Sequence, residues 1–285
     1  MADIDFITYL TTNSLEYANF LKQTGEALKS GKNNIHWKCM LSNGAEIVPE
    51  GYKCIGNKNT KNYHDSLMHS ISINESLKKV TSEYVIIADV DIAITHKNWD
   101  DIIVRTLNDY SCFGSPNFKR EREGINFPNV PFFCFKKEIM KKIKMDFKPI
   151  VENSYKEQVL ILRNIDYTEA KMLDRNIGEV IIFDTGCKLR GIFKNARLKS
   201  KCLEPINIES EKIQLIFNNK KQKLITKLRC RSHRQQTQFI EYHYNKQVFI
   251  THLGISRARY FNNPGTRSWT ERITNYLKTK YDIIL

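Results

Sequence analysis

The positions of hydrophobic residues along the first 110 residues predict strands and helices in alternation. Residues 4–10 and 35–41 are short apolar runs rich in branched and aromatic side chains, which is typical of strands. Between these runs, apolar residues recur at helical spacing, Asn13 and Glu16 are placed as in a capping box, and Gly31 marks the end of the helix. A strand, a helix and a second strand in this order are typical of the start of a parallel α/β sheet.

The same alternation continues up to the middle of the chain. The polar, glycine-bearing residues 49–62 predict a loop, and the apolar spacing over residues 65–80 predicts a helix. Residues 84–88 form a continuous apolar run, which is typical of a central strand buried on both faces. A further helix is expected over residues 100–110.

Beyond this point the hydrophobic pattern becomes less regular. Short strands are expected at residues 112–114 and 132–135, and residues 180–183 form the one clear later strand. We therefore predict a single α/β domain with a Rossmann-type, mostly parallel sheet, flanking helices and a less regular C-terminal part.

Composition supports one ordinary folded domain. The chain has 285 residues, of which 41% are hydrophobic, which is enough for one large core. No apolar run approaches the roughly 20 residues of a transmembrane helix, and the first residues lack the basic stretch of a secretory signal. The seven cysteines stand singly, which predicts reduced thiols and no structural zinc site.

The net charge of +14 is concentrated in the second half of the chain. Residues 185–203 carry six Lys or Arg and no acid, and residues 212–240 contain no Asp or Glu at all. Such asymmetry indicates a polyanionic partner such as DNA, an anionic membrane surface, or only a solvated basic face. The candidate nucleic-acid contacts are Lys188, Arg190, Lys227, Arg229, Arg231 and Arg234.

Two carboxylates, Asp89 and Asp91, directly follow the apolar run at 84–88. Open α/β sheets bind ligands at the carboxyl ends of their strands. In an extended segment, residues two apart point to the same side, so both carboxylates can hold one divalent ion. The alternatives are a solvated pair of loop aspartates, or a haloacid-dehalogenase-type phosphatase, although that motif requires Thr or Val where Ala93 stands.

Residues 69–91 resemble the corresponding stretch of family-2-like GT-A glycosyltransferases. In that pattern a helix carrying an Asn, here Asn74, precedes a strand that begins like Glu83-Tyr84-Val85 and ends in an Asp-x-Asp motif. The resemblance covers roughly the first 110 residues. It implies that residues 1–110 form the nucleotide-sugar-binding half of a GT-A domain, and residues 111–285 the acceptor-binding half with the basic C-terminal region.

The resemblance also implies a donor and a metal ion. Mn2+ or Mg2+ on Asp89 and Asp91 would hold the diphosphate of a UDP- or GDP-type sugar. Asn74 would lie near this donor, and Thr8 and Tyr9, at the end of the first strand, would border the nucleotide. For Asn74 the alternative is a helix residue that hydrogen-bonds a neighbouring loop.

Several later polar residues are candidates for the same site. By the resemblance, His252 would be a third metal ligand, with His243 as the competing candidate and a core histidine as the alternative. Arg257 and Arg259 would contact the diphosphate of the donor. Asp184 ends an apolar strand and is the candidate general base of an inverting reaction, or else only a helix cap.

The basic half of the chain indicates the acceptor. Its Lys and Arg residues, interleaved with tyrosines, resemble in general character viral enzymes that glycosylate hydroxymethylated pyrimidines in DNA. The alternatives are a transferase that builds a surface polysaccharide and a basic nucleic-acid-binding protein without catalysis. We expect a cytoplasmic protein, in the host cytoplasm if the source is a virus, while the sugar, the stereochemistry and the oligomeric state stay open.

Overall fold

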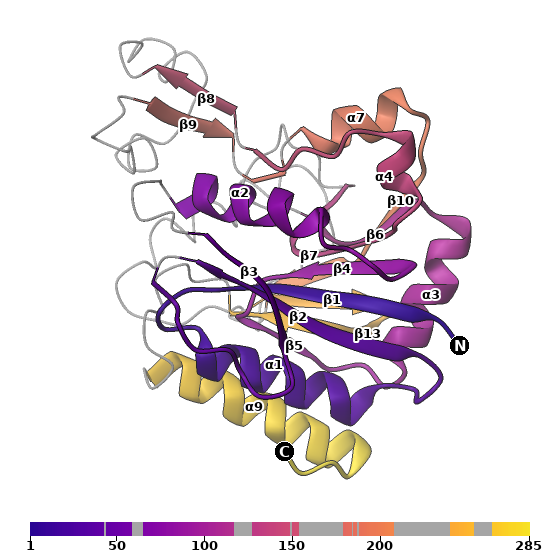
Figure 1. The fold of residues 1–285 in the computed structure, drawn as a ribbon. Helices are drawn as coiled ribbons and strands as arrows, with labels where there is room; N and C mark the ends of the chain where they lie inside the picture. Colours follow the sequence, from indigo (N-terminus) through magenta and orange to yellow (C-terminus); the bar gives the residue numbers. More distant parts are fainter. Residues whose placement is uncertain are drawn as a thin grey trace.

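A computed structural model describes residues 1–42, 44–58, 65–116, 127–148, 150–153, 179–183, 185–186, 188–207, 240–253 and 264–285. Helices and strands alternate along most of this length (Figure 1). The elements, in chain order, are β1 (Asp3–Leu10), α1 (Leu15–Leu28), β2 (Asn34–Ser42), β3 (Lys53–Lys58), α2 (Asp65–Leu77), β4 (Tyr84–Ala88), β5 (Ile92–Ile94), α3 (Trp99–Asp109), β6 (Cys112–Pro116), β7 (Pro128–Lys136), α4 (Ile139–Lys142), β8 (Ile150–Asn153), β9 (Glu179–Phe183), α7 (Leu189–Asn195), β10 (Ser200–Cys202), β11 (Glu204–Asn207), β12 (Ile240–Tyr244), β13 (Gln247–His252) and α9 (Pro264–Tyr281).

A seven-stranded sheet forms the centre of the molecule, in the order β10-β6-β7-β4-β1-β2-β3. Its neighbouring strands are parallel except at β7, which runs antiparallel to both β4 and β6. Strands β11, β12, β13 and β5 form a second sheet, and β8 pairs with β9. The predicted α/β class with a mostly parallel sheet is confirmed.

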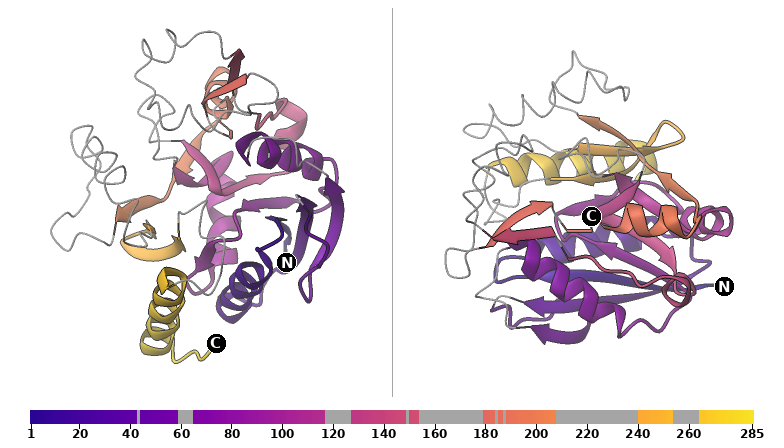
Figure 2. Two further views of the ribbon diagram at one scale, coloured as in Figure 1. Left: turned by 90° about the vertical axis from the view of Figure 1, so that its left-hand side faces the viewer. Right: turned by 90° about the horizontal axis from the view of Figure 1, so that it is seen from above.

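Strand β4 divides two hydrophobic clusters. Tyr84, Ile86 and Ala88 belong to one cluster, whereas Val85 and Ile87 belong to the other, because successive side chains of a strand point to opposite faces. Helices α1, α3 and α9 pack on the first face, and α2, α4 and α7 on the second. Figure 1 and the left view of Figure 2 show α1 and α9 on one side of the sheet and α2 on the other.

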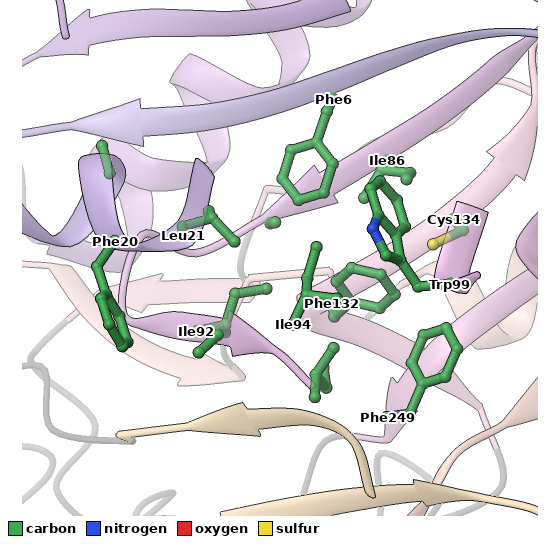
Figure 3. Close-up of a cluster of buried hydrophobic side chains, with 14 of the residues drawn as sticks. Phe6, Phe20, Leu21, Ile86, Ile92, Ile94, Trp99, Phe132, Cys134 and Phe249 are labelled. Carbon is green, nitrogen blue, oxygen red and sulfur yellow. The ribbon is translucent and has the colours of Figure 1, made fainter. Parts of the chain in front are cut away.

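Large aromatic side chains fill the first cluster (Figure 3). The ring of Phe6 lies 4.4 Å from that of Trp37 and meets Trp99 edge-on at 5.8 Å, measured between centroids. The indole N–H of Trp99 donates to the carbonyl of Gly25 at 2.9 Å. A Cβ at Gly25 would stand 2.7 Å from the Trp37 ring, so helix α1 approaches the sheet this closely only because residue 25 has no side chain.

Three local predictions were wrong. Helix α1 begins after Ser14, not Asn13, and makes no side-chain cap, because the Ser14 hydroxyl accepts the backbone N–H of Thr11 at 3.1 Å. The expected loop at 49–62 contains strand β3, whose backbone pairs with β2 without any apolar pattern. The later part of the chain holds more than one strand, since β10 to β13 follow β9.

Both predicted halves contribute to one sheet. Strands β6, β7 and β10, which come after residue 110, complete the sheet that β1 to β4 begin. Helix α9 returns to the N-terminal part, where Trp269 meets Phe20 of α1 edge-on at 5.4 Å. The chain therefore has no packing boundary at residue 110 among the described residues, and the functional division there stays a prediction. Within the described residues, no helix combines the length and the apolar character that a bilayer crossing requires.

The cysteines of the described residues are free thiols, at positions 39, 54, 112, 134 and 202. Burial raises the pKa of Cys39 and of Cys202 to about 12, so both thiols stay protonated at neutral pH. This agrees with the expectation of reduced cysteines.

Candidate metal centre

The two aspartates follow the carboxyl end of β4. Asp89 comes directly after Ala88, and its backbone N–H donates to the carbonyl of Pro131 at 2.9 Å. Val90 and Asp91 form a turn, after which β5 leaves the main sheet for the second sheet. The expectation of an extended Asp-x-Asp segment was therefore wrong: a turn, not an extended strand, presents the pair.

Strand β13 brings His252 to this turn from the far end of the chain. It pairs antiparallel with β5, which places His252 opposite Ile92. The backbone N–H of Leu253 then donates to the carbonyl of Asp91 at 2.9 Å. One short strand pairing thus brings His252 beside the aspartates, and its role as a third metal ligand stays a prediction.

Asp89, Asp91 and His252 form a compact cluster. His252 Nε2 lies 3.2 Å from Asp91 Oδ1 and 4.0 Å from Asp89 Oδ2. One potential ligand atom from each residue lies within 4.8 Å of the others. The side chains of His252, Asp91 and Asp89 are 14%, 19% and 26% exposed, so all three are partly accessible to solvent.

This donor set fits a divalent cation. Carboxylates suit Mg2+ and Mn2+, and a neutral imidazole beside them favours Mn2+ over Mg2+. His252 directs Nε2 toward the aspartates, while its Nδ1 is buried without a partner among the described residues. Three protein ligands would leave coordination positions of an ion for other ligands, as catalytic metal sites do.

A second histidine, His69 of α2, also touches the cluster. Its Nε2 lies 3.3 Å from Asp89 Oδ1, and its ring meets Tyr9 edge-on at a centroid distance of 5.0 Å. His69 was not predicted from the sequence, because nothing in the local pattern of α2 distinguishes it from any other half-exposed helix residue. The only signal was its place at the start of the stretch that carries the resemblance.

Thr8 and Tyr9, the predicted nucleotide neighbours, lie beside this cluster. The Thr8 hydroxyl donates to the carbonyl of Ala88 at 2.9 Å and is fully buried, so it links β1 to β4. Burial raises the pKa of Tyr9 well above its ordinary value, and its hydroxyl contacts Ser76 at 2.8 Å. Tyr9 borders the metal centre through His69. A direct contact of Thr8 or Tyr9 with a donor stays a prediction.

Asn74 and Lys188 meet at one carboxylate. Asn74 Nδ2 donates to Asp146 Oδ1 at 2.9 Å, its Oδ1 accepts the backbone N–H of Phe147 at 3.1 Å, and Lys188 Nζ lies 3.3 Å from Asp146 Oδ2. Burial would raise the pKa of Asp146, but hydrogen bonds from the Lys148 N–H and Asn74, with the charge of Lys188, hold it below its usual value. Asn74 thus bonds a neighbouring loop, as its alternative interpretation expected, and its donor role stays a prediction.

Most of the later candidates lie outside the described residues: Asp184, Lys227, Arg229, Arg231, Arg234, Arg257 and Arg259. Arg190 is described and exposed on α7. Thr185 is buried, and its carbonyl accepts Asn129 Nδ2 at 3.0 Å. The competing histidine, His243, pairs with Glu241 at 2.8 Å and is no part of the cluster.

Comparisons with known proteins find similarity in structure alone. No protein-family model matches the chain, and no curated protein matches its sequence. The structure is similar to the mannosyltransferase PcManGT from Pyrobaculum calidifontis in complex with GDP-Man and Mn2+, with a TM-score of 0.36, 11% identity and 50% of this chain covered. The chain spans 47% of that protein's length.

Galactosyltransferase LgtC, in complex with donor and acceptor sugar analogues, is similar over 98% of this chain and 97% of its own, with a TM-score of 0.47 and 12% identity. An active-site mutant of LgtC is similar over 70% and 72% of the two chains, with a TM-score of 0.41 and 11% identity. The structural neighbours are thus nucleotide-sugar glycosyltransferases. At these scores the likenesses support no functional conclusion for this chain.

Proposed function

We propose that the chain is a metal-dependent glycosyltransferase that uses a UDP- or GDP-linked sugar as donor. The observation that carries this proposal is the convergence of Asp89, Asp91 and His252 at the carboxyl end of β4. This edge of an open α/β sheet is where such folds bind nucleotides. A divalent ion bound there supplies positive charge that stabilises the leaving diphosphate.

The protein's own residues would hold and orient the reactants. During transfer, the bond between the sugar C1 and the diphosphate oxygen breaks, and a bond forms between C1 and the acceptor oxygen. Arg257 and Arg259 are suited to bind the diphosphate in bidentate fashion. In an inverting reaction, Asp184 would take the proton of the acceptor hydroxyl.

The proposed acceptor is a hydroxymethylated pyrimidine base in DNA, with a surface polysaccharide as the alternative. Basic residues on α4 and α7, and in the segments that follow these two helices, support a polyanionic acceptor. The exposed ones include Lys141, Lys142, Lys144, Arg190, Lys194, Arg197 and Lys199. Such a surface would bind a phosphate backbone with steep salt dependence.

The test is a transfer assay read by mass spectrometry. Wild type, Asp91→Ala and the control Asp109→Asn, which changes an exposed carboxylate at the end of α3, are incubated with Mn2+, nucleotide sugars and DNA that contains hydroxymethylcytosine. We expect a sugar-sized mass gain on the modified nucleoside for wild type and the control, and none for Asp91→Ala.

The other outcomes separate the alternatives. Asp91-dependent hydrolysis of the nucleotide sugar without transfer to DNA would support the transferase activity and indicate a glycan as the acceptor. Salt-dependent DNA binding that is indifferent to Mn2+, without transfer or hydrolysis, would identify a nucleic-acid-binding protein instead. Equal activity of wild type and Asp91→Ala would contradict the proposed metal centre.

A further inference from the structure

Two histidines face opposite oxygens of Asp89. Oδ2 is the oxygen that faces His252, at 4.0 Å, whereas Oδ1 lies 3.3 Å from His69 Nε2. Among the described residues, the cluster of mutually close ligand atoms includes Asp89, Asp91 and His252 but not His69. His69 therefore contacts the Asp89 carboxylate without belonging to this cluster.

We propose that His69 is a positioning residue, whose imidazole N–H hydrogen-bonds to Asp89 Oδ1 and leaves Oδ2 as the oxygen that binds the ion. This rests on the metal centre of the proposed function. Residues that orient a metal-binding side chain from outside the ligand set strongly influence metal affinity.

The fold holds the His69 ring in this place. In β4, Val85 and Ile87 face α2, and Asp89 meets α2 through His69. The ring rests edge-on against Tyr9, whose own position is fixed by Ser76 of the same helix. Because the Ser76 hydroxyl donates to a helix carbonyl at 2.7 Å, it accepts the hydrogen of the Tyr9 hydroxyl. The attachment of His69 to helix α2 and its contact with Tyr9 of strand β1 thus restrict the position of the imidazole.

The arrangement has a consequence for the choice of metal. A carboxylate with one oxygen already engaged by a hydrogen bond binds an ion through the other oxygen alone. Mn2+ and Mg2+ accept such single-oxygen ligands at short distances, whereas Ca2+ takes more ligands and readily uses both oxygens of a carboxylate. His69 therefore favours Mn2+ over Ca2+ at this centre.

The test measures the affinities of the full chain for Mn2+ and Ca2+. Free Mn2+ is quantified by electron paramagnetic resonance, and Ca2+ by its competition with Mn2+. His69→Leu removes the donor, while His69→Gln keeps an N–H at nearly the same reach. His243→Gln is the matched control, because His243 is paired with Glu241 outside the cluster.

We expect His69→Leu to weaken Mn2+ binding by about 10–100-fold and to narrow the preference for Mn2+ over Ca2+. His69→Gln should recover most of the affinity, and His243→Gln should match wild type. In pulsed resonance spectra, the nitrogen modulation from a directly bound imidazole should persist in His69→Gln and vanish in His252→Gln. If His69→Leu does not fold, His69→Asn replaces it, because its shorter amide cannot reach Asp89.

Each contrary result has a distinct meaning. Wild type that binds no Mn2+ overturns the metal centre and the role of His69 together. If His69→Leu binds Mn2+ as tightly as wild type, while His252→Gln loses Mn2+ binding, only the role of His69 is overturned. If His69→Gln does not restore the Mn2+ affinity, His69 acts through packing. If His69→Gln loses the nitrogen modulation, His69 is a direct ligand. Either result also overturns the positioning role.

Discussion

Replacing Asp5 with Ala should destabilise the fold more than replacing its ionic partner Lys38 with Met. Asp5 is fully buried and accepts Lys38 Nζ at 2.7 Å, the Ser82 hydroxyl at 2.7 Å, and the backbone N–H groups of Thr81 and Ser82 at 2.7 and 3.2 Å. Lys38 also donates to the Thr81 hydroxyl at 2.7 Å. The carboxylate is therefore the centre of the network, and the ammonium is one of its branches.

The expected energies follow from what each substitution leaves behind. Asp5→Ala leaves a buried ammonium and two backbone N–H groups without their acceptor, and removing one partner of a buried ion pair costs about 3–5 kcal/mol. Lys38→Met leaves a carboxylate that keeps the hydrogen bonds from the hydroxyls and backbone N–H groups of Thr81 and Ser82, for which we expect a cost of about 2 kcal/mol. The difference between the two variants is the informative quantity, because both break the same ion pair.

The same network predicts how stability depends on pH. Burial would raise the pKa of Asp5, but hydrogen bonds from Lys38, Ser82 and the backbone N–H of Thr81 outweigh it and hold the pKa below its ordinary value. A lowered folded-state pKa means that the stabilisation is present above the unfolded value of about 3.9 and is lost as the pH falls through the folded value. Wild type should therefore lose this contribution in acid, and Asp5→Ala should lack it at every pH.

Urea unfolding at neutral and acidic pH, followed by tryptophan fluorescence, measures both effects. We expect similar slopes for all variants, and a midpoint for Asp5→Ala well below that of Lys38→Met. The reasoning is refuted if Lys38→Met costs as much as Asp5→Ala, or if the stability gap between wild type and Asp5→Ala persists unchanged at a pH where Asp5 is protonated.

Three further substitutions test the site and its support. His252→Gln should weaken Mn2+ binding at least about 10-fold in resonance titrations, whereas His243→Gln should not, and equal losses would contradict the cluster. Gly114→Ala should cost about 1–3 kcal/mol or more in urea unfolding, because its Cβ would clash with the backbone carbonyl of Phe132 in β7. Gly191→Ala is the control, because its Cβ would meet no atom, and it should be neutral or stabilising. Phe249→Ala should leave a cavity in the first cluster and cost about 3–5 kcal/mol by the same measurement, so an unchanged midpoint would show that the core had refilled.

Local hydrophobic patterns predicted the elements that bury their own side chains. Strand β4 is buried along its whole length, and its apolar run gave its bounds correctly. Strand β3 lies at the edge of the sheet, so its backbone pairing with β2 needs no apolar residues, and its sequence, KCIGNK, looked like a loop. The antiparallel direction of β7 also has no local signal, because pairing direction depends on the path of the chain between strands.

Local sequence patterns also predicted only part of the candidate metal centre. Asp89 and Asp91 were identified from their place after a buried strand, which is a local property. His252 was reached only through the resemblance to a family, since its approach depends on the pairing of β13 with β5. His69 was missed, because its distance from Asp89 depends on how α2 packs across β1 and β4.

Because β13 pairs with β5, the cluster of Asp89, Asp91 and His252 can assemble only after β13 has been synthesised. When a ribosome has made the first hundred residues, Asp89 and Asp91 already exist, together with the strands β1, β2 and β4 that surround them. The third member of the cluster, His252, is translated only with β13, long after both aspartates. The nascent protein therefore cannot assemble the cluster of Asp89, Asp91 and His252 until β13 has left the exit tunnel. A product truncated before residue 252 would carry both carboxylates without the imidazole.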